Sequence, residues 1–307
     1  MTKINFMAWR KVAFILSSLI IIGSVVSLFA KQLNWGLDFT GGTLIEVSYT
    51  ESVTLGPVRD ALSQAGYGDA VVQHFGSSKD VMVRLEPREG VNNQALGDKV
   101  FDVLAAQNPE VTKSRVEFVG PKVGEELAND GTLAMVTALI CIMIYVAFRF
   151  EWRFALGAVG ALVHDVIITL GVFSVLQLPF DLNVLAALLA VIGYSLNDTI
   201  VVSDRIRENF RKIRKGTPVE VVDISLNDTL SRTLMTSLTT LLVLVALFFL
   251  GGEQIHGFAT ALLIGVIVGT YSSIYVASTI ALALGITKED LMPVQVEQEG
   301  ADQEPML

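Results

Sequence analysis

Residues Leu182–Val202 read LNVLAALLAVIGYSLNDTIVV, an apolar run whose one charged side chain is Asp198. About 20 consecutive apolar residues are enough for a helix to cross the hydrocarbon core of a bilayer. An ionisable side chain inside such a helix is costly, so it marks a position with a function or a specific partner. The segment therefore predicts a membrane-spanning helix that carries a carboxylate within it.

Similar apolar blocks occur along the rest of the 307-residue chain, which is 52% hydrophobic and 17% charged. They predict an α-helical integral membrane protein with six membrane helices, the last five forming one bundle over 131–287. The predicted helices are 12–30, 131–148, 154–176, 182–204, 230–250 and 257–284. The first block is longer than the apolar core of a signal peptide and lacks a small-residue cleavage site, which favours an uncleaved anchor.

Basic residues give the predicted orientation of these helices. Lys and Arg cluster before the first helix and within 205–215, whereas the short turn 178–181 contains neither. Cytoplasmic loops carry an excess of Lys and Arg. The segments predicted to be cytoplasmic are 1–11, the loop 205–229 and the tail 288–307, which leaves 31–130 outside.

The segment 31–130 has the pattern of a small folded domain. Its alternating and helical stretches follow the order β-α-β-β-α-β, which is the order of the ferredoxin-like α+β motif. The predicted strands are 43–49, 70–75, 81–85 and 115–119, and the predicted helices are 55–64 and 92–107. The one cysteine, Cys141, lies in a membrane helix, so the external domain has to fold without a disulfide.

The distribution of charge excludes nucleic acid as a partner. The net charge is −9, and the external segment 31–130 has nine Lys and Arg against fifteen Asp and Glu. A nucleic-acid-binding surface needs the opposite sign. The tail 288–307, with one Lys against six acids, is predicted to be disordered because it has little apolar surface to bury.

A second charged residue begins the fifth predicted helix. Arg232 lies at the start of LSRTLMTSLTT, and Thr236 and Thr240 follow it at four-residue spacing, which predicts a hydroxyl-lined stripe below the guanidinium. Burial raises the pKa of a carboxylate, whereas a neighbouring guanidinium lowers it. Arg itself does not release its proton. Asp198 and Arg232, with Asn197 beside them, therefore form either a proton relay or a static ion pair. Arg232 alone also fits an anchor at the membrane surface.

The third predicted helix contains His164 and Asp165 well inside its apolar run. Neighbouring residues are about 100° apart on a helix, so both side chains fit the edge of one polar interior. They belong either to a structural polar network or to the relay. A metal site is not expected, because the three His are scattered along the chain. Asp204 is expected to pair with Arg205 or Arg207 near the helix end.

Five strings in chain order resemble the SecF subunits of the SecD/SecF family, within the resistance-nodulation-division superfamily. They are GLDFTGGTLIEV at Gly36–Val47, GPKVGEEL at Gly120–Leu127, FRFEWRFALGA at Phe148–Ala158, GYSLNDTIVVSDRIREN at Gly193–Asn209 and LSRTLMTSLTT at Leu230–Thr240. The resemblance covers nearly the whole chain. It places the family's membrane carboxylate and arginine on Asp198 and Arg232.

The resemblance implies a multi-pass protein of the bacterial inner membrane that works with SecD and the SecYEG translocon. YajC, SecA, the unfolded exported polypeptide and membrane lipid are the further partners it implies. The pair would use the proton gradient to promote translocation, with protons as coupling ions and no other cofactor. Enzymatic activity is not expected, because no Gly-x-Ser-x-Gly or His-Glu-x-x-His motif is present. The alternatives are a proton-driven small-molecule exporter of the same superfamily and a non-transporting membrane scaffold.

Overall fold

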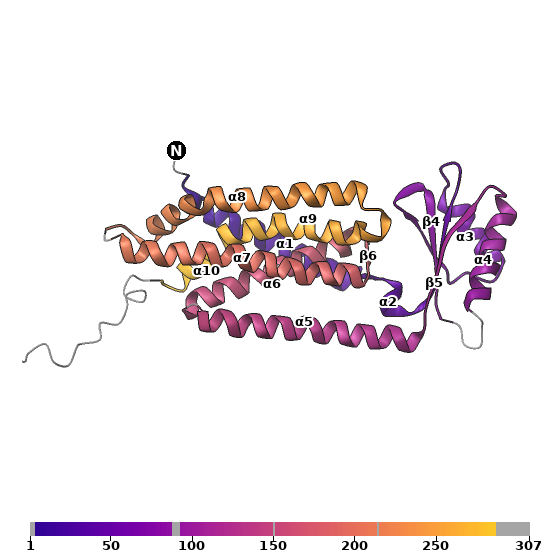
Figure 1. Cartoon of the computed structure of the whole chain (residues 1–307), viewed down its shortest axis with the longest axis horizontal. Helices are drawn as coiled ribbons and strands as arrows, with labels where there is room; N and C mark the ends of the chain where they lie inside the picture. Colours follow the sequence, from indigo (N-terminus) through magenta and orange to yellow (C-terminus); the bar gives the residue numbers. More distant parts are fainter. Residues whose placement is uncertain (1–3, 88–92, 150, 214, 287–307) are drawn as a thin grey trace, which may run out of the picture.

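The computed structural model describes residues 4–87, 93–149, 151–213 and 215–286, and the predicted tail lies outside them. Six helical segments are long and apolar enough to cross a membrane, which confirms the multi-pass prediction. They are α1 (Arg10–Ala30, preceded by η1, Phe6–Trp9), α5 (Pro121–Arg149), α6 (Trp152–Leu176), α7 (Leu182–Lys212), α8 (Pro218–Leu250) and α9 (Glu253–Ser272), which continues through the π-helical segment η2 (Ser273–Ala277) into α10 (Ser278–Ala283). Figure 1 shows the helices side by side, with an α/β domain at one end and the start of α8 toward the other.

Most of the segment 205–229, which was predicted as a loop whose basic front part continues the preceding helix, is helical. Helix α7 continues to Lys212 and α8 already begins at Pro218. The start of α8 has a capping box, in which the Thr217 hydroxyl accepts from the Glu220 N–H and Glu220 accepts from the Thr217 N–H. Lys, Arg and Glu are good helix formers, so the basic run extends α7 rather than ending it. The two extensions bury apolar residues such as Phe210 and Val222 in the bundle core.

The α/β domain has the predicted order of elements. They are β2 (Gly42–Ser48), α3 (Leu55–Gln64), β3 (Val71–Phe75), β4 (Ser77–Leu85), α4 (Asn93–Gln107) and β5 (Thr112–Val119). The four strands pair antiparallel in the order β3-β4-β2-β5. Side chains alternate between the faces of a strand, so Ile45 and Val47 pack in the core that α3 and α4 help to form, while Leu44 points to the opposite face.

This domain is connected to the bundle by short elements that were not predicted from the sequence. Strand β1 (Asn34–Trp35) pairs parallel with β6 (Pro179–Phe180), and a one-turn helix α2 (Leu37–Thr40) follows β1. The chain then enters β2 through Gly41 and Gly42, whose φ angles are 66° and 122°. A Cβ atom on Gly42 would lie 2.2 Å from the Leu85 carbonyl oxygen, so this position requires glycine.

Helix α5 leaves the domain directly and begins earlier than the predicted residue 131. One residue, Gly120, separates the end of β5 from Pro121, the first residue of α5. This first part of α5 packs closely on the segment that enters the sheet. A Cβ atom on Gly124 would lie 2.9 Å from the Gly41 backbone nitrogen, so the close contact needs a glycine at this position. Along the bundle, α5 buries few of its own residues.

Candidate functional site

The carboxylate of Asp198 lies at a point where three helical segments meet. Asp198 is on α7 and is 6% exposed. Thr233 on α8 donates to its Oδ1 at 2.8 Å, and Ser273 at the start of η2 donates to its Oδ2 at 2.5 Å. Each carboxylate oxygen therefore has a neutral hydroxyl donor, which makes the burial of this group tolerable.

Arg232 does not form the direct ion pair with Asp198 that one interpretation of the sequence predicted. Within the described residues, the Asp198 side chain has Thr233 and Ser273 as its hydrogen-bond partners, while Arg232 is exposed on the surface of the bundle. The guanidinium is still close enough to act on the carboxylate electrostatically. Neutral hydroxyl groups, and not a direct ion pair, therefore hold the Asp198 carboxylate in place.

Arg232 lines a polar cavity of about 850 Å³ at the end of the bundle away from the α/β domain. Asn197, which is exposed, lines the same cavity. The remaining lining residues are Ile200, Val201, Asp204, Arg205, Arg207, Glu208, Arg211, Lys212, Asp228 and Thr229. Two of its lining residues are sequence neighbours of the buried site: Asn197 precedes Asp198 on α7, and Arg232 precedes Thr233 on α8. The polar surface of the cavity therefore lies next to the turn of each helix that holds the carboxylate.

The hydroxyl stripe that follows Arg232 on α8 lies on the side of the helix that faces away from Asp198. Thr236 donates to the Arg232 carbonyl at 3.0 Å and Thr240 donates to the Thr236 carbonyl at 2.9 Å, so both hydroxyls bind their own helix. The polar face that points into the bundle consists of Thr229, Thr233 and Ser237, all of them buried. These three also follow a four-residue spacing, so helical periodicity could have shown that stripe but could not choose between the two.

His164 and Asp165 are fully enclosed and form a second polar network. The Nδ1 atom of His164 lies 2.8 Å from Asp165 Oδ1, and its Nε2 atom lies 3.1 Å from the Ser17 hydroxyl on α1. The other Asp165 oxygen accepts from Ser195 on α7 at 2.5 Å and from Ser272 on α9 at 2.7 Å. The pair is therefore hydrogen-bonded to three other helices, an arrangement that fits both a structural network and a relay.

Small residues allow the helices to approach closely at this network. The Cβ position of Gly269 on α9 lies 3.1 Å from Ser195 Cβ and 3.5 Å from Asp165 Oδ2. The Cβ position of Gly265, one turn earlier, lies 2.1 Å from a Val191 methyl carbon. The glycine spacing on α9 thus serves packing within the chain.

Two expectations about partners have to be corrected or extended. Asp204 pairs with Arg149 at 2.8 Å instead of with Arg205 or Arg207, since α5 and α6 turn close to the end of α7. Arg205 pairs with Glu208 at 2.9 Å. Thr233, Ser272 and Ser273 were not among the residues predicted for the site. The short polar run Tyr271-Ser272-Ser273 within an apolar helix is the sequence signal from which the two serines could have been predicted.

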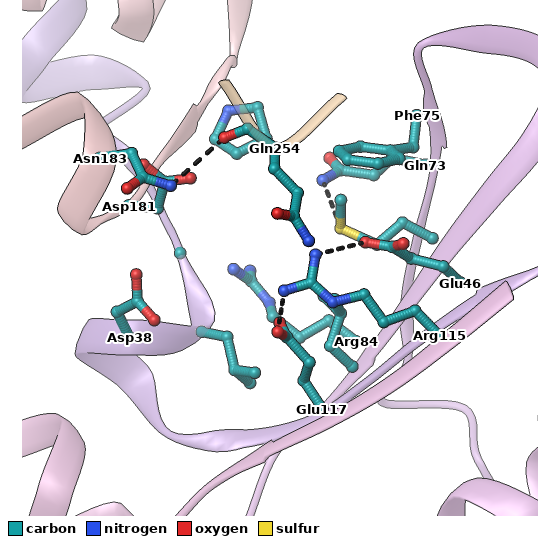
Figure 2. Close-up of a pocket in the computed structure, with 15 residues that line it drawn as sticks. Asp38, Glu46, Gln73, Phe75, Arg84, Arg115, Glu117, Asp181, Asn183 and Gln254 are labelled. Carbon is teal, nitrogen blue, oxygen red and sulfur yellow. Dashed lines mark hydrogen bonds and ion pairs between the residues drawn. The ribbon is translucent and has the colours of Figure 1, made fainter. Parts of the chain in front are cut away.

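A second polar cavity, of about 190 Å³, lies between the α/β domain and the bundle (Figure 2). In it, Arg115 pairs with Glu46 at 3.8 Å and with Glu117, while Arg84 donates to the Trp35 carbonyl. The other charged lining residues are Asp38 and Asp181, which accept from backbone N–H groups at the start of α7. Burial raises the pKa of the Asp181 carboxyl, and the charge of Asp38 adds to this effect.

The comparisons with known proteins agree with this architecture. The family model for the C-terminal part of the SecD/SecF protein export membrane proteins matches residues 99–287, and the model for the SecD/SecF GG motif matches 26–53. The chain is 60% identical over 304 residues to a protein translocase subunit SecF from Vibrio alginolyticus, covering 99% of this chain and 96% of that one. It is 52% identical to the corresponding subunit from Escherichia coli O157:H7, covering 99% and 94%.

Two solved structures of SecDF are also similar to this chain. The crystal structure of SecDF, a translocon-associated membrane protein from Thermus thermophilus, is similar with a TM-score of 0.84 at 40% identity. The Super-membrane-facing form of SecDF is similar with a TM-score of 0.69 at 39% identity. In both comparisons the match covers 92% of this chain but 39% of the SecDF chain. The chain belongs to the SecD/SecF family of protein export membrane proteins.

Proposed function

We propose that the chain is the SecF subunit of a protein-export complex in the bacterial inner membrane. It acts with SecD, uses the proton motive force and promotes translocation of unfolded polypeptides through SecYEG, in a complex that also includes SecA and YajC. The names of its relatives support the transport role. The length of the SecDF chains supports SecD as the partner. This chain matches 39% of a SecDF chain, and a SecD-like chain would supply the remainder.

In this proposal the α/β domain is a ferredoxin-like domain outside the cytoplasm. The sheet order β3-β4-β2-β5 and the β-α-β-β-α-β connection support the fold. The Lys and Arg residues at the opposite end of the bundle support the orientation. An impermeant thiol reagent should label Ser78→Cys in intact spheroplasts, in a background in which the single cysteine is replaced by Cys141→Ala. Labelling that requires disrupted membranes would reverse the orientation.

Asp198 is the proton carrier in this proposal, with protons as the coupling ion. The observation that carries it is a buried carboxylate held by hydroxyl donors from two other helical segments, one residue from a polar cavity. Moving one charge across the membrane yields about 2.3 kcal/mol per 100 mV, so a few protons can drive a substantial conformational change. Arg232 keeps its charge at every accessible pH, and it therefore adjusts or replaces the charge of Asp198 rather than carrying the proton.

The decisive experiment measures gradient-stimulated export in membrane vesicles that contain the complex. Asp198→Asn keeps the shape but removes the titrating group, so it should abolish the response to the gradient while the complex still assembles. Asp198→Glu should retain partial activity, and Arg232→Lys should be milder than Arg232→Met. Arg205→Met is the matched control, because Arg205 lines the same cavity but pairs with Glu208.

Three other outcomes of this assay would contradict the proposal. Full gradient-driven export by Asp198→Asn would remove Asp198 from the mechanism. Equal loss of assembly in all the Asp198 and Arg232 variants would support a static structural role. Export that never depends on the gradient would favour the scaffold.

A further inference from the structure

Three consecutive side chains connect the last membrane helix to three others. Tyr271 donates to the Ala13 carbonyl of α1 at 2.9 Å. Ser272 donates to Asp165 Oδ2 of α6 at 2.7 Å, and Ser273 donates to Asp198 Oδ2 of α7 at 2.5 Å. The two buried carboxylates of the bundle are thus bound by adjacent serines, both of which are 0% exposed.

The backbone at this point is unusual. The α-helical hydrogen-bonding of α9 changes to the π-helical pattern at Ser273, the residue that binds Asp198. Such segments are rare and short, and they occur often at functional sites. Adjacent helical residues point about 100° apart, so Ser272 faces α6 while Ser273 faces α7. A small rotation of this one turn changes both contacts together.

Each serine also has a second acceptor within its own helix. The Ser273 hydroxyl lies 3.0 Å from the Thr270 carbonyl oxygen, and the Ser272 hydroxyl lies 3.1 Å from the Gly269 carbonyl oxygen. A hydroxyl has one proton to donate. While Asp198 is ionised, Ser273 donates to it. When Asp198 takes up a proton, the carboxylic acid becomes a donor to the Ser273 oxygen, and the Ser273 proton turns to Thr270.

We propose that Ser272 and Ser273 are positioning residues that couple the protonation state of Asp198 to the His164–Asp165 pair. This inference rests on the proposed role of Asp198 as proton carrier. Reorientation of the Ser273 hydroxyl changes the turn that also holds Ser272 against Asp165, and Asp165 in turn holds the imidazole of His164. The proton on Asp198 is the only one gained, and the hydroxyl protons merely exchange acceptors.

Several titratable or charged groups lie around this turn. They are His164 and Asp165 on α6, Tyr194 and Asp198 on α7, Asp223 and the more distant Arg232 on α8, Tyr271 on α9 and Tyr275 on η2. Helix α1 contributes a neutral hydroxyl, Ser17, to the imidazole. His164 is hydrogen-bonded to Asp165, which accepts from Ser272, and Ser272 is the covalent neighbour of Ser273, so the imidazole ring is a suitable reporter for this turn.

The test follows the imidazole ¹⁵N resonances of His164 in the full chain, reconstituted in liposomes and labelled on histidine. The other two histidines are replaced by His74→Gln and His256→Gln, so that one ring is observed. Asp198→Asn mimics the protonated carboxyl and should move the His164 resonances or their pH titration. In the Ser273→Ala background the same Asp198→Asn change should leave His164 where it was. A double-mutant cycle of this kind isolates the coupling.

Matched variants keep the result interpretable. Thr229→Val deletes a buried hydroxyl of α8 that binds only backbone carbonyls of its own helix, so the response of His164 should persist. Ser273→Thr retains a hydroxyl and should restore the response, which separates coupling from a folding defect. An undiminished response in Ser273→Ala, or none in the wild-type background, would overturn the coupling. Failure of Asp198 as proton carrier would appear separately, as gradient-driven export by Asp198→Asn.

Discussion

Asp38, in the motif that connects α1 to the α/β domain, accepts a hydrogen bond from the backbone N–H of Leu182 at 2.9 Å. Leu182 is the first residue of α7, the helix that carries Asp198 sixteen residues later. Asp181 caps the same helix by accepting from the Val184 N–H at 2.8 Å. The two carboxylates therefore fix the first turn of α7 to the segment that leads into the sheet.

The first prediction concerns this attachment. Asp38→Ala leaves an N–H of the first turn of α7 without its acceptor, and the loss of such a cap costs about 1 kcal/mol. We expect the junction at residues 33–42 to become more sensitive to limited proteolysis, while Asp38→Asn, which can still accept, is milder. Asp60→Ala, an exposed carboxylate on α3, is the control. Equal protection of Asp38→Ala and wild type would contradict this role.

The second prediction concerns the pH dependence of the junction. Burial raises the pKa of Asp181 above its ordinary value of 3.8, so the folded junction binds a proton more tightly than the unfolded chain does. The stabilising contribution of this group is fully present below that ordinary value and is lost as the pH rises through the raised pKa. Asp181→Asn caps a helix almost as well but does not ionise.

The measurement is a proteolysis rate or a spin-label distance across the junction, taken over a pH series. The Asp181→Asn protein should resemble wild type at low pH and hold the junction more tightly than wild type at high pH. An unchanged pH profile in Asp181→Asn would assign the pH dependence to other groups.

The third prediction separates the two threonine stripes of α8. Thr233→Val removes the hydroxyl that donates to Asp198 Oδ1, and hydrogen bonds to charged groups contribute about 1.5 to 3 kcal/mol. We expect a clear reduction of gradient-stimulated export. Thr236→Val, one turn away, loses only bonds to backbone carbonyls and should behave like wild type. A larger defect in Thr236→Val would restore the stripe expected from the sequence.

The fourth prediction concerns glycine packing. Gly265→Ala places a methyl group 2.1 Å from Val191, and overpacking of this kind costs about 1 to 3 kcal/mol. The midpoint of thermal unfolding in detergent should fall. Gly193→Ala on α7 has nothing within 4 Å of its Cβ position, so it should be neutral or slightly stabilising through helix propensity. Similar midpoints for the two variants would mean that the α7–α9 contact relaxes without cost.

The six helices could be predicted from the sequence because the hydrophobicity of a segment is a local property. Asp198 could be singled out because a carboxylate in an apolar run is costly wherever its partners lie. The partners themselves depend on tertiary contacts. Periodicity allows the stripe through Thr236 and the stripe through Thr233 equally well, and which one faces inward depends on the packing of α8 against α7 and α9. Two-residue strands such as β1 and β6 show no periodicity at all, so the junction could not be predicted.

The continuity of β5 with α5 has a mechanical consequence. A single residue, Gly120, separates the sheet from a helix of 29 residues, which at 1.5 Å per residue is about 43 Å long. With so short a connection, and with few of its own residues buried along the bundle, α5 acts as a lever arm mounted on the sheet, and Val146 near its far end packs in the bundle core. A tilt of about 5° at the sheet would carry the opposite end of this arm sideways by roughly 4 Å, as follows from the helix length. That end is where Arg149 meets Asp204, so movement of the α/β domain would strain this ion pair at the opposite end of the bundle.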